Sequence, residues 1–410
     1  MPGLTLIQLI SEQTIQNLLP VLRLQPKRVV HLTTARTAAR SAPIIEAAAR
    51  TGLEVDLENV RLSDMPSIPE THRAVKRAIE SARNEGATPV VNFTGGTKLM
   101  GIGAYAAALR AKIPSLYVDT QDACFVDGAT SNEMAILMDD DWSFTSVHPT
   151  FDLDVIATAN GVPRITPGKN WQPLLPLARH LFGNQAEEQT AHDAVHGEHG
   201  LFPKGREPRT PGAWIDILDE PFTLPANVAR LGVETGLLRA GPSSTQAMLP
   251  DATRSEMIHL ATHKVPDYHA RYFKAVAPLQ HTVAFLSGGW WELIVFEAAQ
   301  QSGLFRDIRW SAHVGEGNGP DTEEDILGLD GVELLYINCK RSSTRNRLLP
   351  LLEEIRARAA TMGGHFNRRF LAVLNPPVGK ALSNLETQAN RLGIRILTRH
   401  DINQIGVFSR

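Results

Sequence analysis

Residues 88–98, TPVVNFTGGTK, join an apolar β-branched run to a glycine turn and then to an alanine-rich stretch. This change of composition predicts a strand, a tight turn and a helix in that order. Gly95 and Gly96 let backbone amides approach an anion at the helix start, and Lys98 adds a cation. The turn has neither the GxxxxGKS/T spacing of a Walker A loop nor the GxGxxG dinucleotide fingerprint. The stretch favours a phosphate or nucleotide cradle; a plain tight turn before a capped helix is the alternative.

Outward from this stretch, short apolar runs alternate with amphipathic or alanine-rich segments over the first 150 residues. Strands separated by helices favour a mostly parallel sheet with helices on both faces, which is a Rossmann-like α/β layout. The expected strands cover 4–10, 28–32, 53–57, 88–93 and 115–119, the expected helices end near 24, 50, 84 and 111, and a closing hairpin is expected over 123–138.

Polar residues follow three of these expected strands. Residues 11–14, Thr33 with Thr34, and residues 92–98 are rich in hydroxyl and amide groups. In such folds the ligand site lies at the carboxyl ends of the parallel strands. Three polar turns at one sheet edge therefore favour a ligand site over three unrelated turns.

Length and composition exclude several classes of protein. The chain has 410 residues, which at roughly 100–200 residues per domain predicts two or three domains. With 43% hydrophobic residues and a formal net charge of −3, it is neither disordered nor a protein that coats nucleic acid through bulk positive charge. Only Cys124 and Cys339 occur, which suits a reducing cytosol. We expect a cytoplasmic protein with no membrane partner, because the sequence has no apolar run of 18 residues and no signal segment.

The middle of the chain, residues 146–290, is punctuated by proline and carries no repeat. His192, His196 and His199 have a spacing that suits one helical face and a metal site. The sequence around them lacks the HExxH order and contains two glycines, so a solvated polar turn is the favoured interpretation. We expect a connector and a helical subdomain here.

The C-terminal part combines a helix with three strands. Glu292 follows two tryptophans on an expected helix, Asp325 lies on the second expected strand, and Lys340 follows the third. This is the order expected of a metal-dependent nuclease core. Oxygen ligands such as Glu292 and Asp325 can hold a divalent metal that polarises a phosphate and generates hydroxide, while Lys340 can orient the attacking water.

Two further observations concern the same region. The carbonyl of Cys339 can add a metal ligand, whereas its thiol is better interpreted as small and buried, since no His is placed to activate it. Residues 338–410 contain thirteen Lys or Arg against four Asp or Glu, an excess that suits a polyanion. A solvated basic face is the alternative interpretation of that excess.

Motifs at both ends together resemble the CRISPR-associated Rossmann-fold (CARF) ancillary nucleases. Those proteins join an N-terminal CARF sensor to a C-terminal PD-(D/E)xK nuclease. The resemblance implies a Rossmann-like CARF domain with a mostly parallel sheet over 1–145, a connector and helical subdomain over 146–280, and a restriction-endonuclease-like α/β nuclease domain over 281–410. The motifs are LISEQTIQN (9–17), NFTGGTK (92–98), GGWWE (288–292), EED (323–325) and NCK (338–340).

The family also implies a homodimer that binds one cyclic oligoadenylate, most often cyclic tetra-adenylate, across its two sensor domains. A two-fold symmetric ligand suits an isologous dimer, because each protomer presents the same turns to half of the ring. The residues that match the family's ligand pocket by position are Ser11, Gln13, Thr14, Thr33, Thr34, Asn92, Thr94, Gly95, Gly96, Thr97 and Lys98.

In the nuclease part, Asp325 matches the PD aspartate, Lys340 the motif lysine and Glu292 the helix glutamate. Asn338 stands where the family has a carboxylate, two residues before the lysine. Its amide oxygen brings no negative charge, so the affinity for metal should be weaker unless Glu292, Glu323 or Glu324 compensates. The catalytic prediction is Glu292, Asp325, Asn338 and Lys340, with Glu292, Asp325 and the carbonyl of Cys339 on Mn²⁺ or Mg²⁺.

The resemblance implies a cyclic-tetra-adenylate-activated, metal-dependent endonuclease of type III CRISPR antiviral defence that cleaves DNA, RNA or both. One alternative is a CARF sensor whose degenerate C-terminal domain binds nucleic acid or a partner without cutting, which Asn338 favours. Another is a ring nuclease that degrades its own activator, although the TGGTK turn contains no His or acid pair to act as a base.

Overall fold

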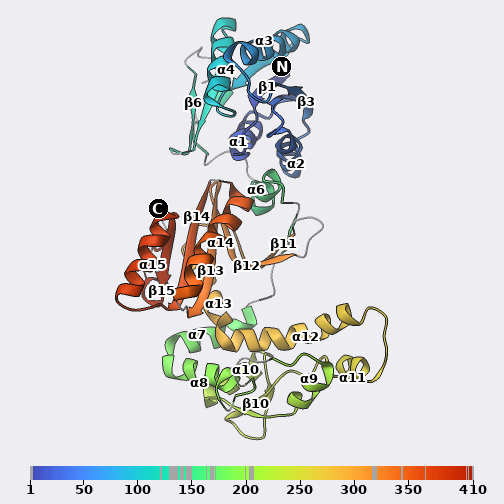
Figure 1. The fold of residues 1–410 in the computed structure, drawn as a ribbon, viewed down its shortest axis with the longest axis vertical. Helices are drawn as coiled ribbons and strands as arrows, with labels where there is room; N and C mark the ends of the chain where they lie inside the picture. Colours follow the sequence, from blue (N-terminus) through green and yellow to red (C-terminus); the bar gives the residue numbers. More distant parts are fainter. Residues whose placement is uncertain are drawn as a thin grey trace.

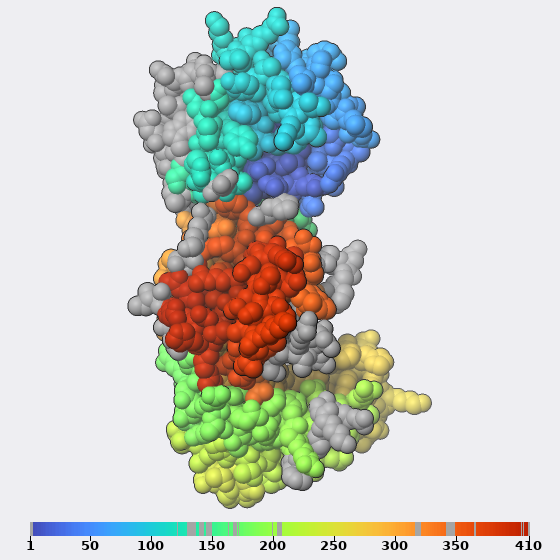
Figure 2. Space-filling view, turned by 60° about the vertical axis from the view of Figure 1, so that its left-hand side comes forward, coloured from blue at the N-terminus to red at the C-terminus, as the bar shows by residue number. Residues whose placement is uncertain are grey.

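The molecule has three parts stacked along its longest axis (Figure 1). An N-terminal α/β unit lies at one end, a second sheet lies in the middle, and a mainly helical part lies at the other end; the space-filling view shows the same three tiers (Figure 2). The computed structural model describes residues 3–120, 122–128, 137–138, 143–144, 150–162, 164–166, 170, 172–198, 200–202, 207–315, 321–342, 345–364, 366–402, 404 and 406–408.

The N-terminal sheet has the strand order β3-β2-β1-β4-β5-β6. The first five strands in chain order run parallel, and β6 pairs antiparallel with β5. This arrangement confirms the Rossmann-like prediction. Strand β6 lies within the closing hairpin predicted over 123–138, but residues 129–136 of that hairpin lie outside the described residues. The strands are β1 (Leu4–Leu9), β2 (Arg28–Thr33), β3 (Asp56–Arg61), β4 (Thr88–Asn92), β5 (Ser115–Asp119) and β6 (Cys124–Asp127).

The third strand begins later than residues 53–57 predicted. The N–H of Leu53 donates to the carbonyl of Ala48 at 3.4 Å, so Leu53 still belongs to the C-terminal turn of the preceding helix. The ladder with β2 then starts at Asp56. An apolar residue beside a glycine was therefore part of a helix C-cap rather than of a strand.

Helices cover both faces of the N-terminal sheet. Leu6 and Ile7 are adjacent and fully buried in different core clusters, because successive strand residues point to opposite faces. One cluster includes apolar residues of the first two long helices, and the other includes those of the next two. The helices are α1 (Ile15–Leu24), α2 (Ser41–Arg50), α3 (Ile68–Asn84) and α4 (Lys98–Ala111), with a 3₁₀ turn η1 (Ala38–Arg40) before α2.

The C-terminal sheet has the strand order β15-β14-β13-β12-β11-β7. Strands β13, β14 and β15 are parallel, whereas β7, β11, β12 and β13 are antiparallel. The bounds are β7 (Arg164–Thr166), β11 (Asp307–Gly315), β12 (Thr322–Asp330), β13 (Glu333–Ser342), β14 (Asn367–Asn375), β15 (Ile394–Thr398), α6 (Leu153–Ala159), α13 (Trp290–Gln301), α14 (Arg345–Gly363), α15 (Lys380–Arg391) and α16 (Arg399–Ile402). Strand β7 comes from the middle segment, so that segment supplies one edge of the sheet.

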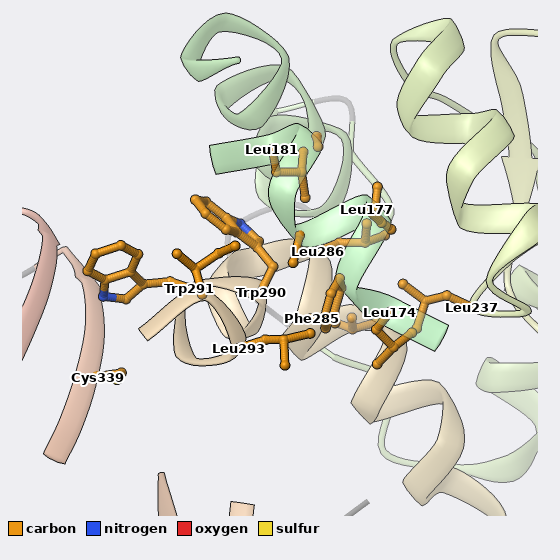
Figure 3. Packing of buried hydrophobic residues seen from close by; sticks show 14 of the residues in the cluster. Leu174, Leu177, Leu181, Leu237, Phe285, Leu286, Trp290, Trp291, Leu293 and Cys339 are labelled. Atoms are coloured by element: carbon orange, nitrogen blue, oxygen red, sulfur yellow. The ribbon is translucent and has the colours of Figure 1, made fainter. Parts of the chain in front are cut away.

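The helical part packs against one face of the C-terminal sheet. Trp290, Trp291 and Phe285 are fully buried in a cluster that also contains Leu177 and Leu181 of α7 (Figure 3). One shared core therefore fixes the helical part to the sheet. Its elements are η3 (Gln172–Leu174), α7 (Leu175–Gly183), α8 (Gln185–His196), α9 (Pro211–Leu218), β8 (Phe222–Thr223), α10 (Ala226–Glu234), β9 (Arg239–Ala240), β10 (Gln246–Met248), α11 (Arg254–Thr262) and α12 (Tyr268–Ala284).

The histidines of the middle segment do not lie in a solvated turn. His192 and His196 are on helix α8, half-buried, with ring centroids 5.2 Å apart. The Nε2 of His196 lies 2.7 Å from the hydroxyl of Ser287, which ties α8 to the segment before α13. His199 lies outside the described residues. The two glycines of the motif follow the helix instead of interrupting it.

Within the described residues, we find no helix whose length and apolar character would let it cross a bilayer.

Candidate functional site

A cavity of ≈ 410 Å³ opens at the carboxyl edge of the N-terminal sheet, where the three polar turns meet. We call it the turn cavity. The turns approach one another because parallel strands end at the same edge. Its lining residues are Ile10, Ser11, Glu12, Gln13, Gln16, Thr34, Arg36, Thr37, Asp64, Gly96, Thr97 and Met100.

The glycine turn is held against the end of β1. A Cβ on Gly95 would lie 1.9 Å from the carbonyl oxygen of Leu9, so only glycine fits there. Gly96 has φ +74°, in the left-handed region that glycine adopts without strain. Thr97 caps α4, its hydroxyl accepting from the N–H of Met100. The turn thus directs the N-terminal end of a 14-residue helix toward the cavity, an arrangement that attracts anions.

A chain of buried hydrogen bonds crosses the sheet beneath the cavity. Asn92 on β4 donates to Gln8 on β1 at 3.2 Å, and the Gln8 amide approaches Nε2 of His31 on β2 at 2.9 Å. Nδ1 of His31 lies 2.6 Å from Ser41, whose hydroxyl donates to Asn59 on β3. Burial lowers the pKa of His31 to about 3, so its ring is neutral and can accept from Gln8 while donating to Ser41. The chain holds four strand ends in fixed register.

The same chain braces the glycine turn. The side-chain oxygen of Asn92 accepts from the backbone N–H and the hydroxyl of Thr94, at 3.0 and 2.6 Å. The Thr94 hydroxyl in turn accepts from the N–H of Val118 on β5, at 2.6 Å. Asn92 and Thr94 therefore shape the turn.

The structure divides the eleven predicted ligand residues into three groups. Ser11, Gln13, Thr34, Gly96 and Thr97 line the turn cavity. Thr14, Thr33, Asn92, Thr94 and Gly95 lie behind this lining and are buried or half-buried, and Lys98 is exposed in the first turn of α4.

Sequence reasoning missed one ion pair and one further carboxylate at the cavity. Nε of Arg36 lies 2.6 Å from Oε1 of Glu12, and both side chains are exposed. Asp64, after β3, accepts from the N–H of Ala35 at 3.0 Å. Arg36 could have been predicted from its position, two residues after Thr34 in the second polar turn. Asp64 was missed because β3 ends four residues later than predicted, so Asp64 did not stand out as a residue at the end of a strand.

A second cavity, of ≈ 580 Å³, lies between α12, α13 and the edge of the C-terminal sheet. We call it the carboxylate cavity, because Glu292, Glu323 and Asp325 all line it. Glu292 lies in the first turn of α13 and faces the strands. The other two come from β12. Ser311 and His313 of β11, and Gln280 and His281 of α12, complete its polar lining.

The glycine pair before α13 sets the position of Glu292. Gly288 has φ +141°, and a Cβ there would lie 2.8 Å from Cβ of Arg341. A side chain at 288 would therefore push the helix away from the end of β13. Arg341 is itself held by buried Glu188, whose Oε1 accepts from its Nε at 2.7 Å. These contacts therefore hold the start of α13, the end of β13 and helix α8 together.

Asp325 and Lys340 are brought together by β12 and β13. Nζ of Lys340 lies 3.6 Å from Oδ2 of Asp325. The same oxygen accepts from the N–H of Cys339 at 2.6 Å. Asp325 is 15% exposed and Lys340 40% exposed, so the carboxylate is largely shielded while the ammonium group reaches solvent.

Electrostatics favour the protonated forms of the two carboxylates. Burial raises the pKa of Glu292 well above its ordinary value, and the charge of Asp325 raises it further. Burial also raises the pKa of Asp325, whereas Lys340 and the Cys339 N–H lower it. Two negatively charged carboxylates in a shielded cavity repel each other, and a cation bound between them would remove this repulsion.

The alternation of β12 is interrupted at Asp325. Ile326 packs in the core on the α13 side, and alternation would place Glu324 on that side too. Glu324 instead accepts from the hydroxyl of Tyr336 at 2.5 Å and from Arg358 of α14 at 3.0 Å. On the neighbouring strand Ser311, between the residues paired with Ile326 and Glu324, has φ +51°. This local break in strand geometry, which leaves the register of the two strands unchanged, turns Asp325 toward Glu292 and Glu324 away from it.

Of the three carboxylates that could compensate for Asn338, Glu324 does not line the carboxylate cavity, whereas Glu292 does and so does Glu323. Glu323 accepts a hydrogen bond from the Ser311 hydroxyl. Asn338 lies on β13, and its amide oxygen is buried without a hydrogen-bond partner among the described residues. Such an atom is an available acceptor for a cation or water.

Cys339 is fully buried beside Trp291, and burial raises the pKa of its thiol (Figure 3). A protonated, enclosed thiol agrees with a packing role for the side chain. In the part of the chain that the structure describes, no group of three or more His, Cys, Asp or Glu side chains is arranged to hold a metal ion. A cation in the carboxylate cavity would therefore be held by fewer than three of these side chains.

Ion pairs neutralise part of the C-terminal basic excess. Arg368 pairs with Asp330 and Glu333, and Arg358 pairs with Glu324 and Glu354. Arg358 and Arg368 therefore make ion pairs within the fold.

One buried side chain connects the two units. The Thr14 hydroxyl, at the start of α1, donates to Oδ1 of Asn160 at 2.9 Å. Nδ2 of Asn160 donates to the carbonyl of Met362 on α14 at 2.9 Å, and Arg40 donates to the Asn160 carbonyl at 3.1 Å. Arg358, one turn before Met362, holds Glu324 beside Asp325. A path of direct contacts thus joins the edge of the turn cavity to the carboxylate strand.

The raised pKa of Glu292 gives a prediction about stability. An acid whose pKa is higher in the folded protein holds its proton more tightly there, so stability falls as pH rises from 4.5, the ordinary value, through the folded value. Without divalent metal, Glu292→Gln should therefore melt above wild type at neutral pH, by roughly 3 °C if the gain is about 1 kcal/mol. The difference should vanish below the ordinary pKa. Thermal melting across pH measures this, with exposed Glu386→Gln as control; a Glu292→Gln variant that melts lower at neutral pH would contradict it.

Comparison with known proteins agrees with the two-sheet architecture. Residues 5–137 match the family model described as the Card1 CARF domain, which identifies this region as a CARF domain. No curated protein matches the chain. The structure of Can2 from Sulfobacillus thermosulfidooxidans in complex with cyclic tetra-adenylate is similar at 15% identity and a TM-score of 0.63, covering 96% of this chain and 92% of that one. Protein VC1899 from Vibrio cholerae is similar at 14% identity and a TM-score of 0.65, covering 98% and 96%. At such identities the likeness shows a shared fold.

Proposed function

We propose that this protein is a metal-dependent nuclease of type III CRISPR defence that is activated by cyclic tetra-adenylate. The observation that carries the proposal is that Asp325, which pairs with Lys340, lines one cavity with Glu292, in a chain whose other end is a CARF domain. The fold shared with Can2, which was solved with cyclic tetra-adenylate, supports this choice of activator.

The turn cavity would bind the cyclic oligoadenylate. Its glycine turn and the start of α4 would meet phosphate, and the hydroxyls and amides of Ser11, Gln13 and Thr34 would meet ribose and base. We propose that two copies of the chain share one ring, each contacting half of it, as a two-fold symmetric ligand requires.

The carboxylate cavity would hold Mn²⁺ or Mg²⁺. Glu292 and Asp325 line this cavity and repel each other, so their oxygen donors fit a hard cation. Asn338 does not line the cavity, and its buried oxygen, which has no partner among the described residues, is a further acceptor on β13. Ions of this kind are often held by one or two carboxylates and keep several waters. The bound metal would polarise the scissile phosphate and acidify the attacking water.

The protein's own groups would do the remaining work. Lys340, held by Asp325 and reaching solvent, would orient the attacking water and balance charge on the phosphate. Glu323, exposed at the cavity and held by Ser311, is placed to accept the proton of that water. The absence of a charge at Asn338 should weaken metal affinity, which favours manganese over magnesium.

Ligand binding would reach the carboxylate cavity through Asn160. A ligand that favours one position of residues 11–14 would move Thr14, and through Asn160 and Met362 it would move α14, which holds Glu324 next to Asp325. Such a switch requires tighter binding of the activator to the active arrangement than to the resting one.

Breaking this contact should uncouple the two sites. Asn160→Ala should lower the ratio of cleavage rates with and without activator by about 5- to 100-fold, while the activator still binds. Thr14→Val removes the same hydrogen bond from the other side without changing shape, so the two substitutions should not be additive. Cleavage assays and titration of the activator measure both effects, with exposed Asn390→Ala as control. Full stimulation in both variants would rule this path out.

The function itself is tested by cleavage of single- and double-stranded DNA and RNA with manganese, in the presence and absence of cyclic tetra-adenylate. We expect cleavage that depends on both additions. Equal rates with and without the activator, or no cleavage in any condition, would defeat the proposal.

A non-catalytic regulator is the second candidate, and Asn338 at the carboxylate position favours it. It predicts that the activator binds and that nucleic acid is held but not cut. A ring nuclease would instead degrade the activator, and Glu12 and Asp64 at the turn cavity would have to supply the chemistry. Incubation of the activator with the protein, followed by analysis for linear products, separates a ring nuclease from the other two candidates.

A further inference from the structure

A third cavity, of ≈ 960 Å³, lies beside the N-terminal half of α12. We call it the α12 cavity. Tyr268, His269, Tyr272 and Phe273 line it, and Phe273 is 63% exposed. A contiguous apolar surface rimmed by polar residues marks an interaction site, whereas a single exposed apolar side chain does not. The sequence patterns that pointed to a nuclease core did not include these residues.

The aromatic rings form a ledge. Tyr268 and Tyr272 are parallel, with centroids 6.2 Å apart, and the Phe273 ring lies 5.8 Å from that of Tyr272. Planar faces that are already oriented by neighbouring rings suit the stacking of flat ligands. Unpaired nucleic-acid bases are ligands of this kind, and their stacking tolerates any sequence.

The ledge is continuous with the carboxylate cavity. Gln280 lines both cavities, and Ala277, His281 and Ala284 of the same helix line the carboxylate cavity. Together with Phe273 these positions recur every three to four residues, which places them along one side of the helix. The helix of 17 residues is roughly 25 Å long and leads directly to the segment that carries Glu292.

The charges beside the ledge also suit a polyanion. Arg209 lines the α12 cavity, and Lys274 is exposed on helix α12. The one lining carboxylate, Glu207, accepts a hydrogen bond from Gln280 at 3.3 Å. One exposed ring and two half-buried rings with cationic groups beside them match the combination that single-strand binding proteins use to track a backbone and stack its bases.

We propose that the α12 cavity binds unpaired bases of a single-stranded nucleic acid and that α12 guides this strand to the carboxylate cavity. The inference rests on the proposed nuclease function and adds to it the form of the substrate. A duplex is excluded from this contact, because its bases are already stacked on each other and turn only their edges outward.

The test measures binding separately from cutting. In an Asp325→Asn background, the fluorescence anisotropy of a labelled oligothymidylate and of a matched duplex is titrated with the full chain. Phe273→Ala should weaken binding of the single strand about 10-fold and leave duplex binding within about 2-fold. Phe273→Trp should retain binding, since it offers a larger stacking face. The control is Val378→Ala, which shortens an apolar side chain that is 85% exposed outside the α12 cavity.

The outcomes separate this inference from the proposed function. Unchanged single-strand affinity in Phe273→Ala, or an equal loss for duplex, would overturn the inference while cleavage by wild type still stood. A dimer that becomes a monomer in Phe273→Ala would assign the cavity to a second copy of the chain and would also overturn it. Loss of single-strand binding in Phe273→Ala, together with wild type that never cuts, would support the cavity and reject the nuclease.

Discussion

Asp325→Asn should abolish activator-dependent cleavage, with a loss of at least about 100-fold in rate at saturating activator. The amide keeps an oxygen that can accept from the N–H of Cys339, so β12 and β13 should stay joined. It removes the charge that holds Lys340 and that would bind the cation. Cleavage of labelled substrate with manganese measures the loss, and titration of cyclic tetra-adenylate should give wild-type affinity.

Lys340→Ala provides a second measurement of the same centre. It should lower the rate by a similar factor, because the ammonium group acts with Asp325 as one unit, and the double variant should be little worse than either alone. Lys380→Ala, at the start of α15, is the matched control and should cleave normally. Substantial residual cleavage in Asp325→Asn would place the catalytic centre elsewhere in the chain.

Gly95→Ala should remove activator binding and destabilise the N-terminal unit. The added Cβ would lie 1.9 Å from the carbonyl oxygen and 2.9 Å from the carbonyl carbon of Leu9, and both are backbone atoms that cannot rotate away. The glycine turn must therefore move off β1, which opens the turn cavity. We expect a decrease of about 1–3 kcal/mol in the free energy of unfolding, typical of overpacking, and at least about a 10-fold loss of affinity for cyclic tetra-adenylate.

Gly212→Ala is the matched control for this change. Gly212 lies on helix α9, and a Cβ there would have no neighbour within 4 Å. Alanine should leave binding unchanged and should stabilise the helix by about 0.5–1 kcal/mol. Calorimetry measures the stability of the two variants, and ligand titration measures their affinity for cyclic tetra-adenylate. The two variants carry the same substitution, but only at Gly95 do backbone atoms obstruct the added Cβ. Equal behaviour of the two variants would mean that the turn is not held as described.

The α/β architecture followed from local patterns. The strand of 88–92, its glycine turn and the helix after it appear in the structure because composition and turn chemistry act over a few residues. The meeting of three polar turns at one edge also followed, because the topology of a parallel sheet places strand ends together. The less accurate boundary, at residues 53–57, arose where a helix C-cap contained an apolar residue.

The roles of individual side chains required the tertiary structure. Thr14 and Thr34 occupy similar polar turns, but Thr34 lines the turn cavity while Thr14 binds Asn160, 146 residues away. Glu323 and Glu324 are adjacent, and only the first lines the carboxylate cavity, beside the break in strand geometry that has φ +51° at Ser311.

Periodicity and turn residues encode where the chain is extended, helical or reversed, since those preferences depend on nearest neighbours. Contacts between distant segments decide three other properties. These are the direction of a side chain beside a break in strand geometry, the partner of a buried hydroxyl and the exposure of the Phe273 ring. Such contacts are decided by how the cores of both sheets and the helical part pack, and short-range patterns carry no information about that packing.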